Sequence, residues 1–144
     1  MKLKQFINES IYDSKCFVYH TTTKDNLDLI KKSGKLIPTD HIYFGKLYPN
    51  RLHLSTDKRS HIRMIRAIAD EKEGYNIDNL FTLVIKIDCY VPEDSDGFDI
   101  EYKDLKPDNN AGYDGYSFYI QKSIPLSQVA EILPFKSFIN SRKY

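Results

Sequence analysis

The sequence contains no tryptophan, only two cysteines and almost no excess of charge of either sign. Cys16 and Cys89 lie in apolar runs without a Cys-x-x-Cys or a nearby histidine spacing, a pattern typical of small buried side chains in a reducing compartment and not of a zinc site or a disulfide framework. Twenty-one basic and twenty acidic side chains give a net charge of +1, so no overall field would hold nucleic acid. A nucleic-acid partner would need a local cluster of charge, and the strongest cluster is Lys58, Arg59, Arg63 and Arg66.

Long hydrophobic runs are also missing. No apolar stretch approaches the roughly 20 residues that a membrane-spanning helix needs, and no segment resembles a secretory signal. Glycine-rich phosphate loops, HExxH motifs and carboxylate-dense metal boxes are absent as well, so neither a resident metal nor a membrane partner is expected. The 144 residues fit one soluble domain, for which the cytoplasm is the expected location.

Two helices are predicted from their capping residues and apolar spacing. Thr23 supplies an N-cap hydroxyl to the first helix, and Gly34 suits a left-handed C-cap. The residues of this helix that are expected to point inward are Leu27, Leu29 and Ile30. Asp57 caps the second helix, which is expected to run to about Ala69. Its apolar residues at one face are Ile62, Ile65 and Ile68.

Strands are predicted over residues 15–20, 51–55, 80–90, 116–124 and 128–135. The third has the cleanest alternation and is expected to be central. Residues 39–51 lose their apolar period around Gly45 and Pro49 and are predicted to form a loop. Residues 92–115 are rich in Asp, Gly, Asn and Pro and are predicted to form a long excursion or lid. The mixed order, without regular strand-helix alternation, predicts an α+β fold.

A histidine at the end of a strand, followed by three hydroxyl side chains, can present an imidazole nitrogen and backbone groups to a ligand. This pattern occurs in "VYHTTTKDNLDLIKKSGKLIP", which is followed by "HLSTD" before a helix and by the strand "TLVIKID". The order resembles that of the ADP-ribosyltransferase fold, in particular its diphtheria-toxin-like branch with a Tyr-His-Gly-Thr strand. The similarity covers residues 17–90 and, more loosely, the segment "YSFYIQKSIPLSQVAEI".

The resemblance implies a mixed two-sheet domain over residues 10–144, with a helix after each of the first two motif strands and a cleft that binds NAD as a substrate. The residues that would bind NAD are Tyr19, His20, Thr21, Ser55 and Thr56. His20 would bond the adenosine-side ribose and the backbone of Thr21 would hold the nicotinamide amide, while the last two brace the cleft. Catalysis would stabilise an oxocarbenium-like ribose as nicotinamide leaves.

Several positions depart from the family pattern. Thr21 stands where the family often has glycine, and Leu54 stands where it has an aromatic residue that stacks on nicotinamide. A further tyrosine of the family site would fall near Met64 or Ile65, and neither replaces it. The rings that could take the stacking role come from the preceding loop, namely Tyr43, Phe44 and Tyr48.

The catalytic carboxylate of the family has no direct counterpart. The family's last strand carries a glutamate before a tyrosine, whereas here Phe118 precedes Tyr119. Strand alternation places Asp114 on the same face as Phe118, so Asp114 is the best candidate for the missing group. Gln121 would serve only if the register shifts by one residue, and Glu101 only if the segment 92–115 folds over the site.

Two other hypotheses belong to different functional classes. The segments "HTT" at residues 20–22 and "HLS" at residues 53–55 match His-x-[Thr/Ser], the paired motif of the two-histidine phosphoesterases. There one imidazole acts as base and the other as acid on a cyclic phosphate, so His20 and His53 would be the pair; only one helix and a loop separate them, which is little chain for the two lobes of that family. The third hypothesis is a catalytically inactive relative that binds and inhibits a host defence protein.

The first ten residues, "MKLKQFINES", resemble the capsid-targeting peptides of internal head proteins in T4-like bacteriophages, which end in an Ile/Leu-x-Glu cleavage site. Residues 1–9 are therefore either a cleavable targeting peptide or an ordinary N-terminal helix. The targeting alternative implies a protein that is packaged in the virion head and injected into the host cytoplasm, where its partner is a host target protein or a host defence enzyme. The sequence indicates no oligomeric state.

Overall fold

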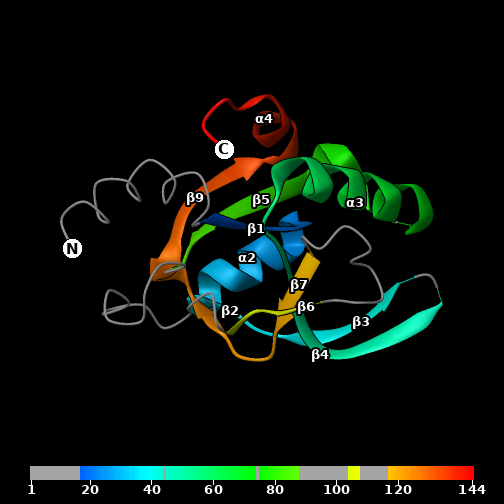
Figure 1. Ribbon diagram of the computed structural model, residues 1–144, viewed down its shortest axis with the longest axis vertical. Helices are drawn as coiled ribbons and strands as arrows, with labels where there is room; N and C mark the ends of the chain where they lie inside the picture. Colours follow the sequence, from blue (N-terminus) through cyan, green and yellow to red (C-terminus); the bar gives the residue numbers. More distant parts are fainter. Residues whose placement is uncertain (1–16, 44, 74, 88–103, 108–116) are drawn as a thin grey trace.

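The computed structural model describes residues 17–43, 45–73, 75–87, 104–107 and 117–144 (Figure 1). Its helices are α2 (Lys24–Ser33), α3 (Lys58–Glu71) and α4 (Phe135–Asn140). Its strands are β1 (Phe17–Thr23), β2 (Lys35–Leu36), β3 (Thr39–Tyr43), β4 (Lys46–Ser55), β5 (Leu80–Lys86), β6 (Lys106–Pro107), β7 (Ser117–Ile120), β8 (Ile124–Pro125) and β9 (Val129–Pro134). The predictions for residues 1–9, Glu101 and Asp114 lie outside the described residues.

The strands form one large antiparallel sheet and one small sheet. The large sheet has the order β6-β7-β4-β1-β5-β9, with β3 paired to β4, and the small sheet pairs β2 with β8. The helices α2 and α3 follow the two motif strands β1 and β4 in the chain. The predicted fold class, α+β with two sheets and a helix after each motif strand, is confirmed.

The helix boundaries follow the capping residues closely. Thr23 Oγ1 accepts a hydrogen bond from the Asn26 amide at 3.3 Å, and Gly34 has the left-handed φ of 79° expected of a C-cap. Asp57 Oδ2 accepts from the Ser60 amide at 2.9 Å and starts α3. The expectation that Leu29 points inward is wrong: its side chain is 64% exposed. The buried residue of α2 is Leu27, and side chains two positions apart on a helix do not share a face.

Residues 39–51 form a hairpin and not the predicted loop. Gly45, with φ 76°, lies in the turn between β3 and β4. Pro49 and Asn50 lie in β4 opposite the single residue Asp40, which makes a bulge where Asn50 has φ 48° and its amide donates to Asp40 Oδ1 at 2.8 Å. The two sequence signals that suggested a break therefore mark a turn and a bulge inside one hairpin.

Two strand boundaries differ from prediction, and one helix was not predicted. The strand expected over residues 15–20 continues to Thr23, because β5 pairs with it along its whole length. The strand expected over residues 116–124 is interrupted after Ile120 and resumes as β8 in the small sheet. The helix α4 was not predicted, since it is short and begins directly after a strand. The strand expected at residues 80–90 is β5 over its described part, and it is internal, between β1 and β9.

The core consists of two apolar clusters. One includes Val18 and Leu27 and lies on the α2 side of the sheet, whereas the other includes Tyr19, Ile65 and Phe138 and lies under α3 and α4. Neighbouring residues of β1 therefore enter different clusters, as strand alternation requires. This division decides which residues of the Tyr-His-Thr motif reach a cavity.

Candidate functional site

A cavity of about 670 Å³ opens beside β1, between the end of that strand, α2, the start of β3 and the residues that follow α3. The motif residues that line it are His20, Thr21 and Thr22. His20 and Thr22 share the face of β1 that carries Val18, so the cavity continues the α2 side of the core. The site is therefore located where β1 ends and α2 begins.

The tautomer of His20 is fixed by the backbone of β4. His20 Nδ1 lies 2.9 Å from the carbonyl oxygen of His53, and because a carbonyl only accepts, Nδ1 carries the hydrogen. Burial lowers the pKa of His20 to about 4, against the opposing effect of this hydrogen bond. The ring is therefore neutral at physiological pH, and its Nε2 is a lone-pair acceptor on the cavity side.

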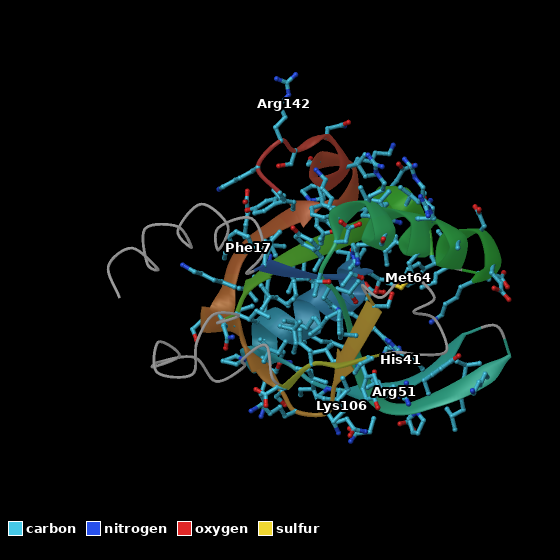
Figure 2. The ribbon with its side chains drawn as sticks, in the orientation of Figure 1. Phe17, His41, Arg51, Met64, Lys106 and Arg142 are labelled. Atoms are coloured by element: carbon cyan, nitrogen blue, oxygen red, sulfur yellow. The ribbon has the colours of Figure 1, made fainter. Side chains whose placement is uncertain are left out.

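A second imidazole, His41, lines the same cavity. His41 Nε2 lies 2.9 Å from the carbonyl oxygen of Arg51 and 3.1 Å from Thr39 Oγ1. Figure 2 shows His41 of β3 and Arg51 of β4 next to each other. Burial, followed by the nearby His53 ring at a centroid distance of 5.2 Å, lowers the pKa of His41 to about 4. Sequence reasoning missed this residue because it treated the segment as a loop.

An aromatic wall is provided by Tyr75, which follows α3. Its hydroxyl donates to the carbonyl oxygen of Thr21 at 3.3 Å, and burial raises the pKa of Tyr75 to about 12. The phenol is therefore neutral and its ring is held against the end of β1. No motif in the sequence pointed to this tyrosine, because its position depends on where α3 ends relative to β1.

The opposite face of β1 contains a sealed hydrogen-bond network. Thr21 Oγ1 lies 2.6 Å from His61 Nε2 and 2.8 Å from Thr82 Oγ1, and Ser55 Oγ lies 2.9 Å from His61 Nδ1. All four side chains are buried. Tyr19 lies on this face too, with its ring centroid 5.0 Å from that of Phe138. The network joins β1, β4, β5 and α3 and does not open on the cavity.

The electrostatic character of the cavity is positive. Lys32, Lys35 and Lys72 line it together with the two neutral imidazoles, and among the described residues no carboxylate does. The exposed apolar side chains Leu29 and Ile37 lie at its wall. Such a lining suits a ligand with an anionic part and a flat apolar part.

The other predicted site residues lie elsewhere. Gln121 is exposed just beyond β7, and its Oε1 accepts from Lys106 Nζ at 3.0 Å. Tyr43 is the last residue of β3, and Thr56 follows β4 without lining the cavity. Phe118, the residue before Tyr119, pairs with Leu54 of β4. The cavity therefore includes His20 and Thr21 of the predicted NAD-binding residues, while Tyr19 and Ser55 belong to the opposite face.

The two His-x-[Thr/Ser] segments do not face a common space in the described structure. The His53 backbone holds His20, and the His53 ring contacts the rings of His41 and Tyr48 at centroid distances of 5.2 and 6.0 Å. Ser55 is bonded to His61 on the buried side. The second motif thus contributes the His53 carbonyl that holds His20, and neither the His53 imidazole nor the Ser55 hydroxyl lines the cavity.

No metal-binding group of three or more His, Cys, Asp or Glu side chains occurs in the part of the chain that the structure describes. Over the same residues, no helix has the length and apolar character needed to cross a membrane.

No family model matches the sequence, and no curated protein matches it significantly. A solved double mutant of protein CC0527 from Caulobacter crescentus is similar in fold, with a TM-score of 0.50, 16% identity, and coverage of 81% of this chain and 82% of that chain. DarT from Thermus sp. 2.9 in complex with NAD⁺ has a TM-score of 0.49 and 16% identity, with 89% of this chain and 92% of that chain covered. At 16% identity the likeness to CC0527 concerns the fold alone.

Proposed function

We propose that the cavity beside β1 binds NAD and that the protein is an ADP-ribosyltransferase-like protein that transfers ADP-ribose to a host macromolecule. The observation that carries the proposal is His20, a neutral imidazole whose Nδ1 is held by the His53 carbonyl and whose Nε2 is an acceptor. It occurs in a Tyr-His-x-Thr strand of the kind that the sequence resemblance identified. The cavity volume of about 670 Å³ also lies within the usual range of roughly 300–1,000 Å³ for ligand pockets.

Each part of NAD has a chemically matched wall. His20 Nε2 would accept a hydrogen bond from a ribose hydroxyl, and the Tyr75 ring would provide an aromatic surface for a flat heterocycle. Lys32 and Lys35 would offset the charge of the pyrophosphate. Leu29 and Ile37, which are exposed, would gain an apolar partner.

The transfer step breaks the bond between the nicotinamide nitrogen and the ribose carbon, and the acceptor nucleophile forms a new bond to that carbon. Positive charge develops on the ribose, so a carboxylate near it would lower the barrier. Asp114, which lies outside the described residues, is our candidate for this group, and the described residues that line the cavity include no carboxylate. A described lining without a carboxylate also supports a second candidate function, in which the protein binds NAD or a host defence protein without turnover.

The test is a titration of the protein with NAD, followed by NMR so that ligand contact and free nicotinamide are measured in one sample. We expect His20→Ala to weaken NAD binding at least about tenfold, because one ligand hydrogen bond and its fixed geometry are lost. Lys31→Ala is the control, since this exposed side chain lies on α2 but does not line the cavity. Unchanged NAD affinity in His20→Ala would sink the assignment of the site.

Nicotinamide release separates the two candidate functions. Release that disappears in His20→Ala and in Asp114→Asn would support the transferase, and added host lysate would then reveal the acceptor. Contact without release would favour the non-catalytic binder. The expected cleavage after Glu9 and packaging in a virion head are part of the same proposal, and mass analysis of the packaged protein would check them.

A further inference from the structure

One side of α3 carries a stripe of cations. Arg59, Arg63 and Arg66 are exposed and fall at i, i+4 and i+7, which places them along one face of the helix. The residues that α3 buries, His61, Ile65 and Ile68, lie on the opposite face. Figure 1 shows α3 at the outside of the molecule, beside α4. The stripe is thus presented to solvent.

The charge of this stripe is not balanced locally. Within the described part of the chain, none of the three arginines makes an ion pair or hydrogen bond through its side chain. They line a hollow of about 860 Å³ together with Lys58 and a single described carboxylate, Asp57. That carboxylate already caps α3 through the Ser60 amide. The hollow is therefore lined by four basic side chains and one carboxylate that is already hydrogen-bonded. This local excess of positive charge contrasts with the net charge of +1 of the whole chain.

Among its described lining residues the hollow has one apolar side chain, Ile62. Ile62 lies between the arginines in the sequence, lines the hollow, and packs partly against the core cluster that contains Phe138. Its position is therefore fixed by the core while part of its surface faces outward. An apolar contact beside arginine side chains is a composition that protein interfaces favour.

Two classes of polyanion could match the charge. Nucleic acid without base recognition needs many phosphate contacts and gains from a large positive field, and this chain is nearly neutral overall. Single strands also need aromatic rings for stacking, and no aromatic residue is among the described residues that line the hollow. An acidic protein segment needs only a few carboxylates and an apolar side chain, which is the complement of what α3 offers.

We propose that the arginine face of α3, defined by Arg59, Ile62, Arg63 and Arg66, is a docking surface for an acidic amphipathic segment of a partner protein. Carboxylates one turn apart on that segment pair with the arginines, and an apolar side chain beside them packs on Ile62. The surface does not share residues with the cavity beside β1. The proposal therefore holds or fails independently of NAD binding.

The experiment uses isotope-labelled full-length chain and three probes. The first probe is a synthetic helical peptide of about four turns with glutamates flanking leucine, the second is the same peptide with lysine in place of glutamate, and the third is a short DNA duplex. We expect the glutamate peptide alone to shift the amide signals of residues 58–66 in a saturable, salt-dependent way. Stronger binding of the duplex at the same residues would overturn the proposal in favour of nucleic acid.

The matched variants make the result specific. Arg59→Gln/Arg63→Gln/Arg66→Gln should weaken binding of the glutamate peptide about tenfold, and Ile62→Ser should weaken it by a smaller factor. The charge-matched control exchanges Lys24, Lys31 and Lys86 for Gln; these residues are exposed and line neither hollow. Equal loss in the control, or none in the arginine variant, would refute the proposal. NAD binding should be unchanged in every variant.

Discussion

Two imidazoles lie on opposite faces of β1 and have different consequences. His20 faces the cavity, with Nδ1 bonded to the His53 carbonyl and no partner for Nε2 among the described residues. His61 is sealed, with both ring nitrogens bonded, to Thr21 and to Ser55. Burial lowers the pKa of both rings, to about 4 and about 3. A perturbed pKa therefore does not distinguish a binding residue from a structural one here, whereas the unused ring nitrogen does.

The largest expected effect is on stability. His61→Ala removes two hydrogen bonds of the network, leaves the buried hydroxyls of Thr21 and Ser55 with fewer partners, and opens a void, so we expect a loss of about 3 kcal/mol in the free energy of unfolding. His20→Ala should cost less than about 1 kcal/mol, because its side chain borders a cavity. Urea denaturation followed by circular dichroism measures both. Equal losses of unfolding free energy in the two variants would contradict the view that His61 is a structural residue and His20 a cavity residue.

The pH dependence of the free energy of unfolding should report on the sealed imidazole, His61. His61 has a folded pKa of about 3 and an ordinary value of 6.5, so between these values the unfolded chain binds more protons than the folded one. Stability is therefore fully present above pH 6.5 and is lost as the pH falls through this window, with a slope of up to about 1.4 kcal/mol per pH unit.

The measurement is the free energy of unfolding of wild type and His61→Gln at a series of pH values. The gap between the two proteins should narrow as the pH is lowered, since Gln does not titrate. The lowered pKa values of His20 and His41 also make the folded state less stable as the pH falls. Both proteins retain these two residues, so their effect cancels in the comparison. A constant gap would show that folding does not lower the pKa of His61.

The smallest expected effect concerns two tyrosines. Tyr75→Phe removes the hydroxyl that donates to the Thr21 carbonyl at the cavity and should weaken NAD binding about threefold to fivefold. Tyr19→Phe should change NAD affinity less than about twofold, because that ring packs on Phe138 in the opposite cluster. Calorimetric titration of both variants compares them directly. A larger loss of NAD affinity in Tyr19→Phe than in Tyr75→Phe would contradict the assignment of NAD to the cavity, because it would place the ligand on the opposite face of β1.

Local sequence signals predicted the helices well. Thr23, Asp57 and Gly34 act through atoms within a few residues, so their roles can be inferred without knowing the fold. The same local logic misled at Pro49, where a breaker residue lies in a bulge that only the pairing with β3 makes acceptable. The helix α4 escaped prediction because its two buried phenylalanines have little meaning until Tyr19 is known to lie beneath them.

The candidate site was predictable only in part for the same reason. The motif identified His20, and strand alternation alone would have assigned Tyr19 and His20 to different faces. His41 and Tyr75 come from segments distant in the chain, and only the hairpin and the end of α3 bring them to β1. Their contribution depends on tertiary contacts that no short pattern encodes.

The late position of α4 has a consequence for synthesis on the ribosome. Tyr19 is made early, yet the side chain that covers it, Phe138, is added more than a hundred residues afterwards. Until then the nascent sheet exposes the apolar face of Tyr19 and Val84, a surface that attracts chaperones and other unfolded chains. Folding of the network face is therefore completed only after α4 has left the exit tunnel, while the α2 side of β1 can begin to form much sooner.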